Sequence, residues 1–281
     1  MIVFLNGEFV PEEQAVVSVF DRGFLYGDGL FEAVRIHNRK PFRWEQHLHR
    51  LAGGAAFLGI AMPFTAEQLR ASLDQLVTAN QMSNAVLRLT LSRGVGARGY
   101  SPDGANQPFV VMTLHPGPGA EAARPPRWRL HTSSFRLPAD EPLARFKTCN
   151  RLPQVLARAE AEAARAQEAL LLNTRGAVVE ATSSNLFWWE NGAACTAPVS
   201  SGILPGITRT VVLELCARFG IPCRETTVDP AELRRAQGVF LTLSSIGVAE
   251  GESLDGHPLA LSPLTERLWA GYHRLLREET G

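Results

Sequence analysis

The stretch "RFKTCNRLPQVLARAEAEAARAQ", residues 145–167, contains one of only two lysines in a chain of 281 residues. The same chain has 26 arginines, so arginine supplies nearly all of its other basic side chains. A guanidinium keeps its proton at any physiological pH, whereas an ε-amine can lose its proton when desolvated and then attack a carbonyl group. Lys147 is therefore a candidate nucleophile. On composition alone, an ordinary surface lysine such as Lys40 in the turn "HNRKP" remains the alternative.

The Ala-rich segment that follows, from Asn150 to about Gln167, has the composition of a helix. Asn150 is the predicted N-cap residue. Pro153 falls in the first turn, where a missing N–H is tolerated. Lys147 is thus predicted to lie just before a helix begins.

Composition narrows the class of protein. A hydrophobic content of 45% in 281 residues is enough for one large or two medium domains with real cores. Equal numbers of basic and acidic residues, 28 each, give no reason to expect nucleic acid or an anionic membrane as partner. The four cysteines show no CxxC pair and no zinc-ligand spacing, so we predict no metal site. The start "MIVFLNGEFV" lacks a signal pattern, and we expect a cytoplasmic protein that binds a small molecule.

The first 115 residues read as a small α+β domain. Short strands are predicted in 2–10, with a turn at Asn6-Gly7, and around the turn in 30–42. Two amphipathic helices follow, over 44–60 and from Thr65 onward, and then two more strands. The Pro- and Gly-rich sequence "HPGPGAEAARPPR" predicts an interdomain linker over 116–127, with one long surface loop as the alternative.

Residues 128–281 are predicted to form a larger, cofactor-binding domain. Strands are expected at 127–134, 168–173, 177–181 and 185–196, the last folding back at Asn191-Gly192. A helix opens at Pro205-Gly206 and closes at Gly220. A buried strand at 238–243 and a long terminal helix complete the chain.

Two short motifs could bind an anion. In "ILPGITRTV" the amides of Ile207 and Thr208 stand at a helix start, where free N–H groups and the helix dipole attract phosphate. Ordinary helix capping is the alternative. Ser244 and Ser245, at the end of the strand in "LTLSSIGV", could offer hydroxyls and amides to the same anion, or could form a plain polar turn.

Glu180 ends the apolar run "GAVVE", where an ionised carboxylate needs a cationic partner. One candidate partner is an arginine, and another is the protonated ring nitrogen of a cofactor. An imine-forming lysine, a carboxylate for a pyridinium and a phosphate cradle together match the requirements of pyridoxal 5′-phosphate (PLP).

The motifs "DRGFLYGDGLFEAVR", "SRGVGARGY", "KTCNRLPQVLARAEA", "VVEATSSNLFWWENG" and "LPGITR" occur in family order over nearly the whole chain. In these motifs and their order the chain resembles the fold-type IV PLP enzymes, which are also called the class IV aminotransferase superfamily. The resemblance implies an α+β, two-domain fold. It has a small α/β N-terminal domain and a larger barrel-like C-terminal domain.

The resemblance also implies roles for single residues. Lys147 would carry PLP covalently and later move the Cα proton, and Glu180 would pair with the pyridine nitrogen. Arg151 would be a cationic neighbour of Lys147 in the cofactor site. The phosphate would be held by Arg50, Ile207, Thr208 and Ser244.

Substrate binding and assembly are implied in the same way. Family members are homodimers in which the loop bearing Arg98 and Tyr100 reaches toward the neighbouring site. Arg98 is then a candidate for the substrate carboxylate, and one more solvated arginine is the alternative. The other substrate-pocket candidates are Tyr26, Phe31, Arg88 and Ser245.

The subfamily features conflict. The patterns KxxNRLxQ and RGxGxRGYS most resemble aminodeoxychorismate lyase, where Arg151 replaces the tyrosine usual in branched-chain aminotransferases. Phe31 stands where D-amino-acid aminotransferases have a tyrosine. Tyr26 and Arg88, however, match branched-chain enzymes. We therefore predict a lyase that converts 4-amino-4-deoxychorismate to 4-aminobenzoate and pyruvate in folate biosynthesis. The alternatives are a class IV aminotransferase using branched-chain or D-amino acids with 2-oxoglutarate, and a binding protein without turnover.

Overall fold

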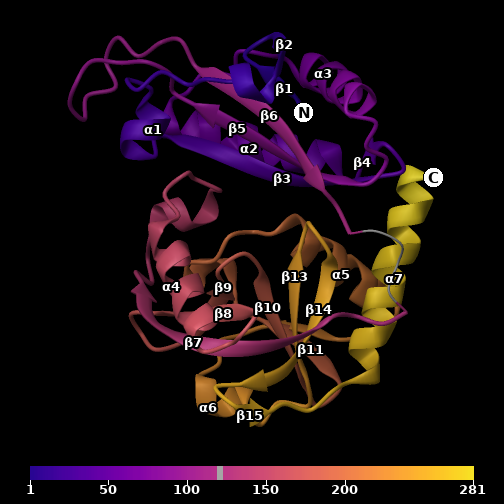
Figure 1. The fold of residues 1–281 in the computed structure, drawn as a ribbon. Coiled ribbons are helices and arrows are strands. Elements are labelled where there is room, and N and C mark those ends of the chain that lie inside the picture. The colour runs from indigo at the N-terminus through magenta and orange to yellow at the C-terminus, as the bar shows by residue number, and fades with distance from the viewer. Residues whose placement is uncertain (119–122) are drawn as a thin grey trace. The chain divides into compact units, whose positions relative to one another are not determined.

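The computed structural model describes residues 1–118 and 123–281 (Figure 1). Its contacts divide the chain into two compact units. Unit 1 comprises Met1–Gly119, Phe146–Asn150 and Arg277–Gly281, and unit 2 comprises Ala120–Arg145 and Arg151–Leu276. The predicted domains differ from these units in two short segments. Phe146–Asn150, which carries Lys147, and Arg277–Gly281 are predicted in the C-terminal domain but belong to unit 1. Residues 119–122 of the predicted linker lie outside the described residues.

Unit 1 contains a six-stranded antiparallel sheet of order β2-β1-β6-β5-β3-β4. Its hairpin β1–β2 turns at Asn6 and Gly7, both with positive φ, which confirms the predicted turn. The strands are β1 (Ile2–Leu5), β2 (Glu8–Pro11), β3 (Gly29–His37), β4 (Lys40–Pro41), β5 (Ala85–Ser92) and β6 (Phe109–Pro116).

Helices α2 (Trp44–Leu58) and α3 (Ala66–Ala79) contact this sheet, α2 at β3 and α3 at β1 and β6 (Figure 1). Thr65 caps α3 in a capping box with Gln68, so the helix starts where the sequence predicts. The apolar faces of α2 and α3 bury Leu48, Leu51, Leu69, Leu73 and Leu76 against the sheet. The short helix α1 (Arg22–Tyr26) precedes β3, and a 3₁₀ turn covers Glu12–Gln14.

The terminal helix α7 (Pro263–Thr280) begins in unit 2 and ends in unit 1. In unit 1, the Lys40 ammonium donates to the Gly281 carbonyl at 2.6 Å, and Arg43 pairs with Glu279 at 3.0 Å. In unit 2, α7 buries Leu268 and Tyr272. Among residues 1–118 and 123–281, every helix is too short or too polar to cross a bilayer.

Unit 2 contains a closed barrel. Strands β10-β13-β14-β7-β8-β9 pair in sequence, and β9 also pairs with β10 through Glu180 and Asn185, which closes the ring. This confirms the expected barrel-like domain. The strands of unit 2 are β7 (Arg127–Leu137), β8 (Glu168–Asn173), β9 (Val178–Ala181), β10 (Asn185–Glu190), β11 (Ala193–Thr196), β12 (Cys223–Glu225), β13 (Val239–Leu243), β14 (Gly247–Leu254) and β15 (His257–Pro258).

Helix α4 (Leu152–Ala163) contacts β7 and β8, and α5 (Ile207–Arg218) contacts β13 (Figure 1). The smaller helical pieces are α6 (Pro230–Leu233) and 3₁₀ turns at Pro142–Arg145 and Val199–Ser201. The prediction that Asn150 caps α4 is wrong, because Arg151 occupies the N-cap position. The Asn150 side-chain amide instead donates to the carbonyl of Gly27 at 3.3 Å.

Candidate active site

Lys147 lies in a segment whose backbone is tied to the start of β3. The amide of Phe31 donates to the Lys147 carbonyl at 2.9 Å, and the amide of Cys149 donates to the Gly29 carbonyl at 2.9 Å. Between them, Leu30 and Thr148 form an antiparallel bridge. The main chain on both sides of Lys147 is therefore fixed within unit 1.

The half-buried Lys147 side chain has aromatic and cationic neighbours. Its Nζ lies 4.6 Å from the centroid of the Phe31 ring, and the Arg88 guanidinium carbon lies 4.0 Å from the same centroid. The charges of Arg88 and Lys147 thus converge on one ring, where an anionic group would be attracted. The sequence could not place these three side chains together.

Arg50 is held by a buried carboxylate. Its Nε and Nη2 donate to the two oxygens of Glu32 at 2.8 and 2.7 Å, and His47 Nδ1 lies 2.7 Å from Glu32 Oε2. Glu32 is only 1% exposed. A two-point bond of this kind fixes the orientation of a guanidinium. Contact between Arg50 and a phosphate remains a prediction.

Glu32 should make stability depend on acid pH. Burial alone would raise the pKa of Glu32, but the charge of Arg50 and the hydrogen bonds from Arg50 and His47 outweigh burial and lower this pKa from 4.5 to about 2. A depressed folded-state pKa stabilises the fold above the unfolded value, and this contribution is lost as pH falls from 4.5 to about 2. Its size is about 3 kcal/mol.

The measurement is the free energy of unfolding in urea at pH values spanning that window, for wild type and Glu32→Gln. We expect the wild type to lose more stability on acidification than the glutamine variant. Glu13→Gln, at an exposed position, should keep the wild-type pH dependence. An identical pH dependence in wild type and Glu32→Gln would contradict the assignment.

In unit 2, Glu180, Asn185 and Thr242 form a row across β9, β10 and β13. Glu180 is 8% exposed, and its Oε2 accepts from the amide of Leu204 at 3.0 Å. The side-chain amide of Asn185 donates to the carbonyl of Leu204 at 2.9 Å. The row therefore holds the peptide groups on both sides of Leu204, three residues before α5 begins.

The start of α5 offers a cradle for an anion. Gly206 is at the N-cap, and the first-turn amides of Ile207 and Thr208 follow. A Cβ on Gly206 would lie 2.0 Å from Asn185 Oδ1, so the close approach requires glycine. Buried hydroxyls of Ser184 and Thr242 have no hydrogen-bond partner among residues 1–118 and 123–281. This set of donors fits a bound phosphate-bearing molecule.

The remaining predicted residues fall into three places. Tyr26 in α1 accepts from the amide of Gly99 at 3.1 Å, and its ring meets that of Tyr100 edge to face at 5.5 Å. Arg98 and Tyr100 are exposed on the loop between β5 and β6. Arg151 is half-buried just before α4. The half-buried residues Ser244 and Ser245 form the turn between β13 and β14.

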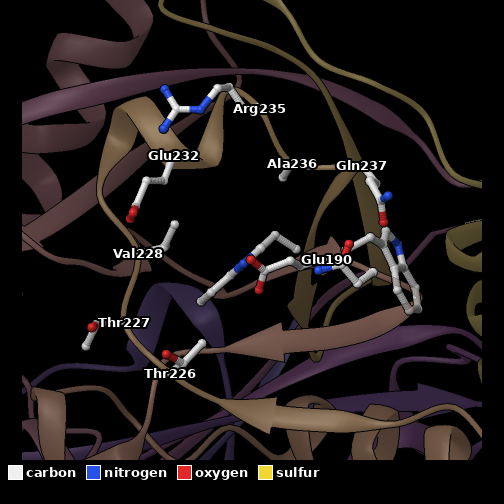
Figure 2. Close-up of a pocket in the computed structure, with 11 residues that line it drawn as sticks. Glu190, Thr226, Thr227, Val228, Glu232, Arg235, Ala236 and Gln237 are labelled. Atoms are coloured by element: carbon white, nitrogen blue, oxygen red, sulfur yellow. The ribbon is translucent and has the colours of Figure 1, made fainter.

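A separate hollow of about 420 Å³ lies in unit 2 (Figure 2). Glu190, Thr226, Glu232 and Gln237 are among its lining residues, and none of the predicted site residues lines it. Strand β10 carries Asn185 at one end and Glu190 at the other, about 17 Å apart at the usual rise per residue. The hollow is therefore not part of the candidate active site.

A family model described as amino-transferase class IV matches residues 29–254. The chain belongs to the class IV aminotransferase family. Members of this family depend on PLP, and the chain has the fold-type IV architecture. The cofactor expected from the sequence is thus confirmed at the level of the family.

Relatives within this family differ in their activities. The chain is 36% identical to a putative branched-chain-amino-acid aminotransferase from Methanocaldococcus jannaschii, over 91% of this chain and 88% of the relative. It is 32% identical to the D-alanine aminotransferase of Bacillus licheniformis, over 100% and 99%. It also matches the crystal structure of 4-amino-4-deoxychorismate lyase from Pseudomonas aeruginosa with a TM-score of 0.84 and 33% identity, over 97% and 98%.

Sequence reasoning missed three residues of this family member's candidate site. Asn185 and Thr242 are polar residues inside apolar strands, and each is at most 5% exposed. Glu32 is the same kind of signal, a carboxylate inside the apolar strand β3. A buried polar side chain needs a partner, so each of these positions could have been flagged from the apolar run around it.

Gly206→Ala should weaken cofactor binding. The new Cβ, 2.0 Å from Asn185 Oδ1, would force the Asn185 amide away from Leu204 and displace the start of α5. We expect the Kd for PLP, measured by fluorescence titration, to be at least about tenfold higher than that of the wild type. Gly53→Ala in α2, where no atom lies within 4 Å of the new Cβ, is the matched control and should bind PLP like the wild type. An unchanged affinity of Gly206→Ala for PLP would contradict the assignment of the α5 start as an anion site.

Proposed function

We propose that this family member is a PLP-dependent lyase that converts 4-amino-4-deoxychorismate to 4-aminobenzoate and pyruvate. The observation that carries the proposal is the motif from Lys147 to Gln154, in which Arg151 takes the place of the tyrosine usual in branched-chain aminotransferases. The loop pattern at Arg98 and Tyr100 and the similarity to the Pseudomonas aeruginosa lyase support it.

In this proposal PLP supplies the electron sink that stabilises negative charge at the substrate Cα. Lys147 would hold the cofactor through Nζ and would accept the Cα proton at the same atom. Glu180 would keep the ring nitrogen protonated through its carboxylate. The phosphate would be held by Arg50, Ile207, Thr208 and Ser244.

The substrate carries two carboxylates, and unit 1 offers two arginines for them. Arg88 lies against Phe31 beside Lys147, and Arg98 is on the loop before β6. Arginine binds carboxylates through two parallel donors, which orients the substrate as well as attracting it. Loss of the Cα proton to Lys147 and cleavage of the C–O bond to the enolpyruvyl group leave an aromatic ring as product. The released enolate of pyruvate takes up a proton to become pyruvate.

Transamination is the second candidate, because the relatives from Methanocaldococcus jannaschii and Bacillus licheniformis are described as aminotransferases. Tyr26 and Arg88 also match the substrate pocket of branched-chain enzymes. In this reaction Lys147 would accept and return the proton at Nζ, and an amino acid and 2-oxoglutarate would exchange the amino group.

One panel separates these functions. The purified holoenzyme is mixed with 4-amino-4-deoxychorismate and pyruvate is followed, and then with branched-chain amino acids or D-alanine plus 2-oxoglutarate. Pyruvate and 4-aminobenzoate in the first reaction support the lyase. Glutamate in the second with no pyruvate in the first would overturn it in favour of an aminotransferase. No product in either would indicate a binding protein.

We also propose that the active form is a homodimer, as expected for this family. Residues 16–25 of unit 1 carry several solvent-exposed apolar side chains. Val16, Phe20 and Phe24 are 73%, 64% and 72% exposed. Exposed clusters of this kind mark protein contacts. Light scattering should give twice the chain mass of 30.7 kDa, and Phe24→Asp should reduce it to one chain. A monomeric wild type would contradict the proposal.

A further inference from the structure

The side chain of Arg22 binds three consecutive backbone carbonyls of the loop between β5 and β6. Its Nη1 donates to Gly99 O and to Ser101 O, both at 3.0 Å, and its Nη2 donates to Tyr100 O at 3.1 Å. Arg22 is 3% exposed, whereas the Tyr100 side chain is 87% exposed. A buried guanidinium thus holds the backbone of a loop whose side chains face solvent.

Arg22 is itself fixed from the opposite side. Its Nε donates to Asp28 Oδ2 at 2.8 Å. Asp28 also accepts from Arg93 Nε at 2.7 Å and Nη2 at 3.1 Å, and Arg93 donates to the carbonyls of Leu58 and Gly59 at the end of α2. The guanidinium of Arg22 therefore donates from one edge to Asp28 and from the other to the backbone carbonyls of the loop. Charge-assisted bonds of this kind are stronger than neutral ones.

Tyr26, one turn along the same helix, holds the loop at a second point. Its Oη accepts from the amide of Gly99 at 3.1 Å, and the Arg22 guanidinium carbon lies 5.0 Å from its ring centroid. Gly96 makes room for this arrangement, because a Cβ there would lie 2.9 Å from Arg22 Cδ. Helix α1 thus binds both the amide and the carbonyl of Gly99.

The same helix is connected to the segment that carries Lys147. Gly27, the C-cap of α1, accepts from the side-chain amide of Asn150 at 3.3 Å. A Cβ on Gly27 would lie 2.4 Å from Asn150 Oδ1. Within unit 1, α1 therefore contacts both the loop at 99–101 and the segment at 146–150.

We infer that Arg22 is a positioning residue that holds the loop bearing Arg98 and Tyr100 in the conformation that binds a carboxylate substrate. This inference rests on the proposed function of that loop. A loop that samples other conformations binds with an apparent affinity reduced by the fraction in the competent one. Loss of Arg22 therefore raises KM, while kcat, which depends on Lys147, changes little.

The first experiment measures how often the loop at 99–101 opens, in the absence of cofactor and substrate. Trypsin cleaves after Arg98 only when the loop leaves its folded conformation, and mass spectrometry identifies the fragment that begins at Gly99. We expect Arg22→Gln and Arg22→Lys to be cleaved there at least about tenfold faster than wild type, because neither can reach three carbonyls. Arg70→Gln, at an exposed arginine of α3 paired with Asp74, is the control and should match wild type.

The second experiment measures KM and kcat of the holoenzyme with the substrate identified by the panel above. We expect a KM at least about tenfold higher in Arg22→Gln, with kcat within about threefold of wild type. Arg22→Lys keeps the positive charge beside Asp28, so it tests the inference even if Arg22→Gln does not fold. Tyr26→Phe removes the acceptor for Gly99 and should speed cleavage after Arg98 as well.

Unchanged cleavage after Arg98 in Arg22→Lys and Tyr26→Phe would overturn the inference, and so would faster cleavage with an unchanged KM. Absence of any turnover in the wild type would overturn the proposed function instead. In that case the cofactor-free trypsin experiment still decides whether Arg22 holds the loop.

Discussion

Replacing Lys147 by alanine is expected to lower turnover by about 10⁴-fold or more, because the variant loses the amine to which we assign cofactor attachment and uptake of the Cα proton. Lys147→Arg should be as inactive, although it keeps the positive charge beside Phe31. A guanidinium cannot give up its proton to become a nucleophile. The pair of variants therefore separates nucleophilic chemistry from simple electrostatic attraction.

The other lysine of the chain supplies the control. Lys40 is exposed and donates to the Gly281 carbonyl, so Lys40→Ala should keep wild-type turnover and the visible absorbance of bound cofactor. Steady-state kinetics and absorbance spectra of the three variants make the comparison. A Lys147→Arg enzyme within tenfold of wild-type kcat would show that Lys147 has another role.

Glu180→Gln is expected to lower kcat by about a hundredfold while the protein stays folded. The glutamine carbonyl can still accept from the amide of Leu204, as Glu180 Oε2 does at 3.0 Å, so the local structure is kept. The negative charge is lost, and in the proposed site this charge would keep the cofactor ring nitrogen protonated. Turnover and melting temperature together test this expectation.

Glu190→Gln provides a matched change at the other end of β10, where Glu190 pairs with Arg224 at the surface. It should leave both kcat and melting temperature close to wild type. If Glu180→Gln turned over as fast as Glu190→Gln, Glu180 would be a structural acceptor for the Leu204 amide and not a partner of the cofactor.

Much of the local structure could be predicted because its causes lie close together in sequence. The Asn6-Gly7 turn, the Thr65 cap and the helix opened by Gly206 depend on residues within one turn of each other. The Asn150 cap failed for the opposite reason. Its amide is bound to Gly27, 123 positions earlier, and no local pattern reports such a contact.

The same limit explains which parts of the candidate site stayed hidden. Lys147, Glu180 and the α5 start could be proposed because their residue types have distinctive chemistry. The contacts that hold the α5 start and the loop at 99–101 could not be predicted, because Arg22 meets Gly99 across 77 positions and Asn185 meets Leu204 across 19. Hydrophobic periodicity reports which face of an element is buried, but not which polar side chains meet across elements.

Borohydride reduction of the holoenzyme tests the central claim most directly, because it fixes the cofactor permanently to the amine that carries it. Trypsin then releases Lys147 in the peptide FKTCNR, residues 146–151, and Lys40 in KPFR, residues 40–43. Mass spectrometry should find the cofactor on FKTCNR and unmodified KPFR. Cofactor on Lys40, or on neither peptide of an active enzyme, would contradict the assignment of Lys147.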